Sequence, residues 1–259
     1  ITQFTDSINK SFWVHSEIDF TADVQDFQSH LMPHEQQIIK KCLLAIAQIE
    51  VNVKSFWGNL YQHLPKPEFN GLGSTFAECE FRHSEAYSRL LEVLNFTNEF
   101  EKLELVPAIS DRIAYLKKAF QNAKSDKNEE YLFSLILFSI LVENVSLFSQ
   151  FGIILYFTRF KGYLKNTSNI IAWTSIDEQI HANAGIHIIN IIQEEFPEFL
   201  DQEAQDKITE IIKESMSVES RILDWIFEEG ELEMISKKDI MNFMKFRVDD
   251  SLSKIGLSK

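Results

Sequence analysis

Two short stretches of this sequence place a carboxylate three residues before an imidazole. They are Glu80-Phe81-Arg82-His83 and Glu178-Gln179-Ile180-His181. On an α-helix, residues i and i+3 lie on the same face, about one turn apart. A glutamate and a neutral histidine so placed can bind one metal ion, and two such pairs on two helices of a bundle can bind two ions.

Two further carboxylates stand in apolar surroundings. Glu50 follows the apolar run at residues 43–49, and Glu143 lies in the middle of the apolar stretch at residues 131–160. Carboxylates with imidazoles suit iron or manganese, and two such ions need bridging carboxylates. Each group alone has an ordinary explanation, such as a solvated helix face or half of a buried ion pair. Together they predict a dinuclear metal site with six ligands: Glu50, Glu80, His83, Glu143, Glu178 and His181.

These residues need helices to carry them. Only eight glycines and five prolines occur, and alternating strand patterns are scarce, so an all-α fold is expected. The ligand set indicates a ferritin-like helical bundle with the dimetal-carboxylate site in its core. After a lead-in over residues 1–30, helices are predicted at about 33–63, 67–95, 108–124, 129–158, 168–195, 198–228 and from 236. Because no repeat or linker interrupts the chain, residues 1–259 are interpreted as one domain.

The composition disfavours several classes of protein. The net charge of −14 argues against nucleic acid or an anionic membrane surface as a partner. The stretch at residues 131–160 is long enough to span a membrane, but Glu143 and neighbouring polar side chains at its middle favour a buried helix. The only cysteines are Cys42 and Cys79, and no signal peptide opens the chain. Both observations indicate a cytoplasmic protein.

Tyr87 lies on the same helical stripe as the first Glu-x-x-His pair, and helix rise alone places it ~5–8 Å from a bound metal. The spacing fits an ordinary core tyrosine equally well. Leu147 and Phe151 follow Glu143 at i+4 and i+8. There they would either separate such a tyrosine from water or serve as plain core.

Residues 76–88 and 175–181 carry the most specific resemblance to a known family. The N-terminal one of these stretches reads Phe-Ala-Glu-Cys-Glu-Phe-Arg-His-Ser-Glu-Ala-Tyr-Ser, and the other reads Ser-Ile-Asp-Glu-Gln-Ile-His. They resemble the small, radical-generating subunit of class I ribonucleotide reductase, and the similarity runs from Phe12-Trp13 to about residue 250. Residues 76–88 resemble the family's second and third metal ligands followed by its radical tyrosine. Residues 175–181 resemble its last two ligands preceded by an aspartate.

Other positions follow the same pattern. Glu50 falls where the family has its first carboxylate, and Glu143 resembles its bridging glutamate. Leu147 and Phe151 resemble its apolar pocket.

The resemblance implies a function. An oxygen species oxidises the dimetal cluster, which stores an oxidising equivalent on the metals or on a tyrosine such as Tyr87. The equivalent passes to a cysteine in a separate large catalytic subunit, which reduces ribonucleotides to deoxyribonucleotides. Trp13, Asp177 and His83 match the family's relay between surface and cluster. An indole can be oxidised reversibly, and a carboxylate bonded to a ligand imidazole couples charge to the metal. The family also implies a homodimer, and no nucleotide-binding residues are assigned.

Two features depart from the family pattern. The first ligand is Asp in most of the family but Glu50 here, as in some manganese-using branches, at least one of which lacks the tyrosine. Manganese is therefore slightly favoured, with dimanganese, manganese–iron and diiron centres all open, and the radical resides either on Tyr87 or on the metals. The chain also begins with Ile1 and stops at Lys259 without the family's flexible tail. We therefore expect it to be the core of a longer protein, and the tail's relay tyrosine is not assigned.

Other functions fit the six ligands alone. A related ligand-binding oxidase would need an open apolar channel to the metals. A ferritin-like store would form a cage, and a purely structural helical protein would bind no metal. Trp13 and Asp177 together favour the reductase subunit.

Overall fold

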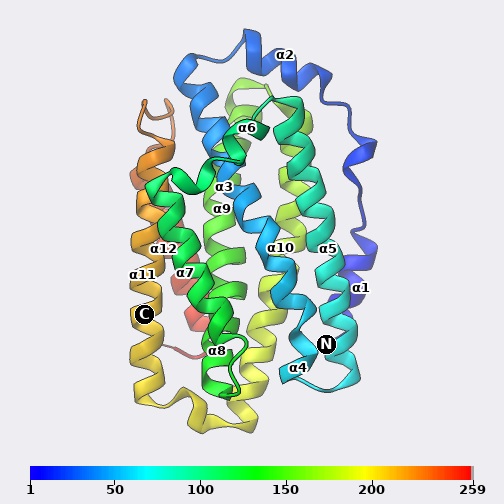
Figure 1. The fold of residues 1–259 in the computed structure, drawn as a ribbon, viewed down its shortest axis with the longest axis vertical. Helices are drawn as coiled ribbons and strands as arrows, with labels where there is room; N and C mark the ends of the chain where they lie inside the picture. Colours follow the sequence, from blue (N-terminus) through cyan, green and yellow to red (C-terminus); the bar gives the residue numbers. More distant parts are fainter. Residues whose placement is uncertain (258–259) are drawn as a thin grey trace.

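Prolines mark the start of three helices that build the bundle. Pro33, Pro67 and Pro107 each lie in the first turn of a helix, where the missing N–H has no intrahelical partner to lose and the fixed φ suits the helix. The helices that follow are α3 (Pro33–Gly58), α5 (Pro67–Val93) and α7 (Pro107–Asn122). The computed structural model describes residues 1–257, and Figure 1 shows them as a bundle of helices.

The other elements complete an all-α fold, and no strand occurs within residues 1–257. Outside the apolar run described below, they are α1 (Thr2–Lys10), η1 (His15–Glu17), α2 (Thr21–Ser29), α4 (Leu60–His63), α6 (Thr97–Phe100), η2 (Leu103–Leu105), α10 (Lys165–Glu195), η5 (Pro197–Leu200), α11 (Gln202–Ile226) and α12 (Lys237–Lys254). The predicted all-α class is confirmed.

Some predicted boundaries differ from the structure. The helix predicted to reach residue 63 ends at Gly58, and α4 follows after Asn59. The predicted connection at residues 95–107 contains the short turns α6 and η2, and the lead-in at residues 1–30 is mostly helical. Short turns bury few side chains, so they leave little periodicity in the sequence.

The most apolar part of the chain forms one continuous run in which the hydrogen-bond spacing changes. It consists of α8 (Asn128–Ile136), the π-helical η3 (Leu137–Ser146), α9 (Leu147–Tyr156) and the π-helical η4 (Phe157–Lys161). At the end of η3, the N–H of Leu147 donates to the carbonyl of Val142, five residues back. The Ser146 hydroxyl donates to the Leu141 carbonyl at 2.9 Å. The sequence predicts a plain helix here, because residues that are apolar on every face carry no periodicity from which a π turn can be inferred.

This run is long and apolar enough to cross a membrane by length and composition alone. Within the bundle, however, 94% of its most apolar window is buried by other parts of the chain. A helix that is hydrophobic all round is typical of the core of a large protein, so burial accounts for the composition of this run.

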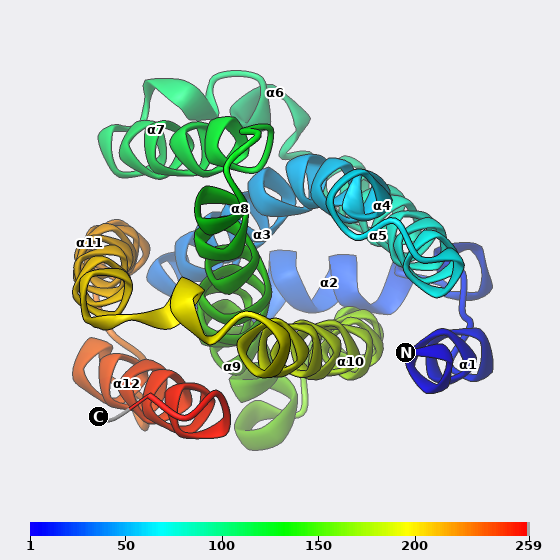
Figure 2. The same cartoon turned by 90° about the horizontal axis from the view of Figure 1, so that it is seen from below.

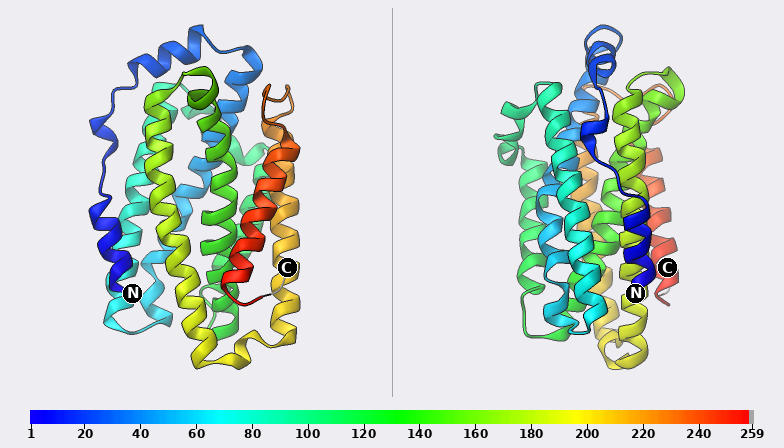
Figure 3. Two further views of the ribbon diagram at one scale, coloured as in Figure 1. Left: turned by 180° about the vertical axis from the view of Figure 1, so that it is seen from behind. Right: turned by 90° about the vertical axis from the view of Figure 1, so that its right-hand side faces the viewer.

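The helices that carry the predicted ligands lie at the centre of the bundle. Figure 2 looks along the bundle and shows α3, α5, α9 and α10 packed together, with α11 and α12 on the side opposite α1. The N-terminal helix α1 packs against α5 and α10, and α2 crosses one end of the bundle (Figures 1 and 3). The strap of residues between α1 and α2 therefore runs along the outside of the helices that hold the site.

Two core helices approach very closely at one glycine. A Cβ built at Gly185 of α10 would lie 2.2 Å from the Cβ of Ser139 in η3, which is closer than two carbon atoms can pack. Ser139 is buried and donates its hydroxyl to the Leu135 carbonyl at 2.6 Å. Gly185 lies one turn after His181, and Ser139 one turn before Glu143. This contact therefore sets the separation of two helices that carry predicted ligands.

Candidate dimetal centre

The six predicted ligands meet in the middle of the bundle as two overlapping groups of four. Within each group, one donor atom from every residue lies within 4.8 Å of the others. The groups are Glu50, Glu80, His83 and Glu178, and Glu80, Glu143, Glu178 and His181. Helices α3, α5 and α10 and the π segment η3 contribute these side chains. The fold thus provides two four-donor sites side by side.

Glu80 and Glu178 belong to both groups, so their carboxylates lie where bridging ligands would be. Glu143 belongs only to the group of His181, and Glu50 only to the group of His83. The bridging role that the family resemblance implies for Glu143 stays a prediction, and the two shared glutamates are further candidates for it. The physical reason is that each of the two shared glutamates reaches both imidazoles.

The two imidazoles present the same nitrogen to the carboxylates. His83 Nδ1 lies 3.0 Å from Glu178 Oε1 and 3.6 Å from Glu80 Oε2. His181 Nδ1 lies 2.8 Å from Glu80 Oε1 and 3.5 Å from Glu178 Oε2. Each Nδ1 therefore faces the same cluster of carboxylate oxygens, and without its proton it would be available as a metal ligand.

The donor atoms have few other partners within the fold. All six side chains are at most 1% exposed. In the described part of the chain, fifteen buried side-chain nitrogen or oxygen atoms lack a hydrogen-bond partner, and nine of them belong to these six residues. Unsatisfied buried polar groups are rare in native proteins and call for an explanation. Their convergence on one point fits a dinuclear centre.

The electrostatics of the pocket also favour bound cations. Burial, with repulsion from neighbouring carboxylates, raises the pKa of Glu50 and Glu143 well above the usual value. Burial acts in the same direction on Glu80, but the imidazoles of His181 and His83 hold the pKa of that carboxyl below its usual range. Two divalent ions would supply four positive charges, which balance four ionised carboxylates beside two neutral imidazoles.

Trp57 on α3 also belongs to the site, although the sequence reasoning missed it. Its indole N–H donates to Glu143 Oε1 at 2.5 Å, and its ring lies 5.0 Å from that of Phe76 and 5.9 Å from that of His181. The bond supplies the partner that a buried Glu143 requires and leaves Oε2 free for a metal. The available signal is that Trp57 lies seven residues after Glu50, on the same helix face.

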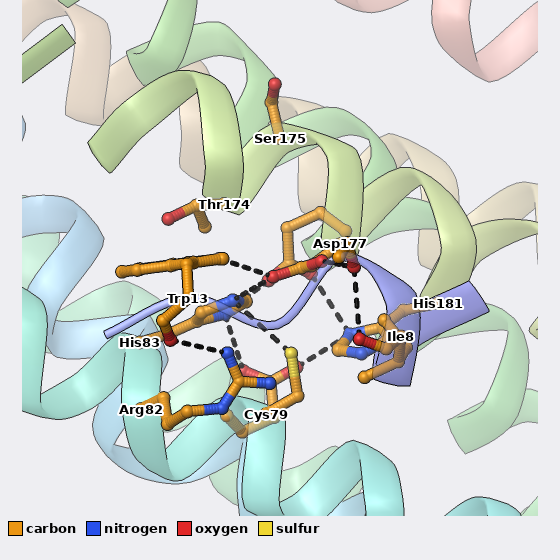
Figure 4. Close-up of polar contacts among 12 residues, drawn as sticks. Ile8, Trp13, Cys79, Arg82, His83, Thr174, Ser175, Asp177 and His181 are labelled. Carbon is orange, nitrogen blue, oxygen red and sulfur yellow. Dashed lines mark hydrogen bonds and ion pairs between the residues drawn. The ribbon is translucent and has the colours of Figure 1, made fainter. Parts of the chain in front are cut away.

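A path of hydrogen bonds leads from the site toward the surface. Trp13 Nε1 donates to Asp177 Oδ2 at 2.8 Å, and His83 Nε2 lies 3.1 Å from the same oxygen. Figure 4 shows the Asp177 carboxylate beside the two rings, within reach of both. The rings are also close to parallel, with an interplanar angle of 17° and centroids 5.6 Å apart. The Ser11 hydroxyl donates to the other oxygen, Asp177 Oδ1, at 2.7 Å. The structure thus brings together the three residues of the predicted relay.

Arg82 holds the segment that carries Trp13. One of its terminal nitrogens donates to the Trp13 carbonyl at 3.0 Å, and its guanidinium lies 4.5 Å from the centroid of the Phe12 ring. Its Nε also donates to Glu78 at 3.0 Å. Sequence reasoning missed both Ser11 and Arg82, because their contacts join distant parts of the chain and leave no local pattern.

Cys79 lies beside this path rather than in the donor groups. Its Sγ is 3.5 Å from His83 Nε2, the nitrogen that faces Asp177, and Figure 4 shows the sulfur next to both imidazoles. Cys79, His83 and Asp177 form a third close group of potential ligands. The bond between His83 and Asp177 already uses that side of the ring, so we do not count it as a third metal site.

Tyr87 is 1% exposed, and its hydroxyl donates to Thr174 Oγ1 on α10 at 3.2 Å. Burial, and next the Glu50 carboxylate, raise the pKa of Tyr87 well above its usual value, so the phenol keeps its proton. Leu147 and Phe151 are each 1% exposed. Sequence reasoning missed Thr174, although it lies one turn before the second Glu-x-x-His pair.

Comparison with known proteins identifies the family. The family model for "Ribonucleotide reductase, small chain" matches residues 1–259. The chain is 28% identical over 251 residues to the "Probable ribonucleoside-diphosphate reductase small subunit 376L" of Invertebrate iridescent virus 6, which covers 89% of this chain and 68% of that protein.

Solved structures share the fold. The ribonucleotide reductase R2 subunit from Clostridium botulinum has a TM-score of 0.90 at 17% identity, covering 99% of this chain and 81% of that one. An R2-like ligand-binding oxidase with a Mn/Fe cofactor has a TM-score of 0.83 at 17% identity, covering 97% of this chain and 92% of that one. These similarities confirm the predicted bundle architecture. With the family model matching its whole length, the chain belongs to the small-chain family of ribonucleotide reductase, as the two Glu-x-x-His stretches predict.

Proposed function

We propose that this ribonucleotide reductase small subunit generates its oxidising equivalent at a dinuclear metal centre held by Glu50, Glu80, His83, Glu143, Glu178 and His181. The observation that best supports the proposal is the path from Trp13 through one oxygen of Asp177 to His83. When bound, the two ions supply reversible oxidation and reduction in a pocket closed to water. Metal analysis is expected to give about two ions per chain, and a protein without stoichiometric metal would refute the proposal.

Asp177 does two things in this function. It accepts a hydrogen bond from His83 Nε2, which fixes the ring and leaves Nδ1 for a metal. It also accepts from Trp13 Nε1, so the carboxylate balances the charge that appears on the indole when it gives up an electron toward the centre. Ser11 donates to the second oxygen of Asp177 and keeps the carboxylate from rotating.

The proposal also covers the partner subunit, the oligomeric state, the location and the identity of the metals. The equivalent serves a large catalytic subunit, where a cysteine receives it and ribonucleotides are reduced. A homodimer and a cytoplasmic location are proposed as well, and the free, buried Cys42 and Cys79 suit a reducing compartment. Glu50 slightly favours manganese over iron. Anomalous scattering at the two donor groups distinguishes dimanganese, manganese–iron and diiron centres.

The burial of the ligands bears on the alternative functions. A ligand-binding oxidase needs an open apolar channel to its metals, whereas the six ligand side chains here are at most 1% exposed. A metal store needs ions to enter and leave readily, and the same burial disfavours that role. The reductase subunit remains the function that the geometry supports best.

Replacing Trp13 tests the relay. Trp13→Gln keeps a donor for Asp177 but removes the oxidisable ring. We expect unchanged metal content and a fall in turnover with the large subunit of at least ~100-fold. Trp173→Gln is the matched control, because the Trp173 ring packs 5.6 Å from that of Trp13, whereas the hydrogen bonds to Asp177 come from Ser11, Trp13 and His83, and it should retain turnover. Full turnover in Trp13→Gln would refute the relay assignment.

Replacing Tyr87 locates the stored equivalent. Tyr87→Phe keeps the ring and loses only the hydroxyl bonded to Thr174, at a cost of about 1 kcal/mol in the free energy of unfolding. We expect the metal content to stay the same and the tyrosyl signal in electron paramagnetic resonance to disappear together with turnover. If signal and turnover are both unchanged, Tyr87 is not the radical store.

A further inference from the structure

Arg247 on α12 contacts the π-helical turn that carries Glu143. Its Nε donates to the main-chain carbonyl of Asn144, and one terminal nitrogen donates to the Asn144 side-chain oxygen. The same nitrogen donates to Gln179 Oε1 at 3.1 Å. Asn144 directly follows Glu143, and Gln179 directly follows Glu178. One guanidinium therefore joins two segments right beside their predicted metal ligands.

The Asn144 carbonyl lies near the end of the π segment and accepts a side-chain donor from another helix. A π segment replaces hydrogen bonds to the fourth residue by bonds to the fifth, and a side-chain donor can stabilise a carbonyl where the spacing changes. A buried carbonyl without a donor is costly, and Asn144 is only 3% exposed. Arg247 supplies that donor from a neighbouring helix.

Further contacts fix the guanidinium itself. It lies 3.6 Å from the centroid of the Phe148 ring, one turn after Asn144. Asn144 Nδ2 donates to Ser251 Oγ at 2.8 Å, and Ser251 Oγ donates to the Arg247 carbonyl at 2.8 Å. The three polar residues thus form a closed loop of hydrogen bonds between α12 and η3. A planar guanidinium can donate in several directions while it stacks on a ring, and a lysine ammonium cannot replace it in this geometry.

We propose that Arg247 is a positioning residue of the metal centre, which holds the wide turn of η3 against α10 and so keeps Glu143 beside His181. The inference rests on the proposed dimetal centre and concerns the position of Glu143, which belongs only to the group of His181. If the turn relaxes by one residue toward α spacing, Glu143 rotates by up to about 100° around the helix axis. The group of His181 then loses a ligand.

Arg247→Lys tests this, since it keeps the charge and removes the forked donor. In metal-free protein, amide hydrogens at residues 137–146 should exchange at least ~10-fold faster than in wild type. Metal-loaded protein should release one ion to a chelator about 10–100-fold faster, while the second ion leaves at the wild-type rate. Arg221→Lys is the matched control. Arg221 lies on the surface of α11, where its guanidinium also donates in two directions, to Asp111 and Ser217. Its replacement should change neither the amide exchange of residues 137–146 nor the release of metal.

A second variant covers the case in which Arg247→Lys does not fold. Asn144→Ala keeps the main-chain carbonyl but removes the side-chain acceptor, so it should give smaller changes in the same direction. Wild-type exchange and release in these variants would overturn the proposal. So would an equal acceleration for both ions, which indicates general loosening of the bundle. If wild-type protein binds no metal, the proposed function fails, and the exchange measurement alone still decides whether Arg247 holds the turn.

Discussion

Glu178→Ala is expected to lose both metal ions, because this carboxylate reaches both donor groups. Its Oε1 lies 3.0 Å from His83 Nδ1, and its Oε2 lies 3.5 Å from His181 Nδ1. Glu143 belongs to one group only, so Glu143→Gln should lose one ion and retain the other. Metal analysis after exhaustive desalting should give roughly zero ions per chain for Glu178→Ala, one for Glu143→Gln and two for wild type.

Thermal unfolding of the same variants separates metal binding from folding. Burial raises the pKa of Glu143 well above its usual value, which favours the neutral acid in metal-free protein, and the neutral, isosteric glutamine should therefore leave Tm nearly unchanged. Added Mn²⁺ stabilises wild type by ~2.7 kcal/mol per site at a hundredfold excess over Kd. Glu143→Gln keeps one site and should therefore show about half of the total two-site gain of wild type. If added Mn²⁺ stabilises Glu178→Ala as much as wild type, the Glu178 carboxylate is not shared by the two metal sites.

Gly185→Val is expected to separate the two helices that hold the group of His181. A side chain at this position meets Ser139, whose Cβ and Oγ would lie 2.2 and 2.3 Å from the new Cβ. Overpacking of this kind costs about 1–3 kcal/mol, a fall in Tm of roughly 2–10 °C for a domain of this size. Because the contact is one turn from both His181 and Glu143, we also expect loss of one metal ion.

Gly152→Ala provides the matched control. Gly152 lies in α9, and a Cβ built there meets no atom within 4 Å. Alanine should therefore raise stability by up to about 1 kcal/mol, the difference in helix propensity, with metal content unchanged. If Gly185→Val and Gly152→Ala have equal stability and equal metal content, the close approach at Gly185 does not set the geometry of the site.

Much of the site follows from spacing along the chain. A Glu-x-x-His pair on a helix puts both side chains on one face whatever surrounds it, so both pairs could be predicted from sequence. Glu50 and Glu143 could be found because a carboxylate in an apolar helix requires a partner. The helix starts at Pro33, Pro67 and Pro107 could also be predicted, because the preference of proline for the first turn depends only on the local backbone.

The remaining features depend on contacts between distant parts of the chain. The bond from Trp57 to Glu143 joins residues 86 positions apart, and that from Ser11 to Asp177 joins residues 166 apart. No local pattern predicts which helix face will meet which. In the sequence, Gly185 looks like an ordinary helix glycine, and only its contact with Ser139 in the folded chain explains it. The π turn of η3 is hidden for a similar reason, because every face of that run is apolar.

The single oxygen shared by Trp13 and His83 has a consequence for the delivery of a stored equivalent. Both rings meet Asp177 Oδ2, so delivery along this path depends on the position of one atom. The buried indole comes from the segment between α1 and α2, whereas the predicted metal ligands lie on core helices. Arg82, which directly precedes the predicted ligand His83, also donates to the Trp13 carbonyl, so this segment and the site are linked. Any movement that lengthens either bond to this oxygen would therefore interrupt the proposed relay at a single point.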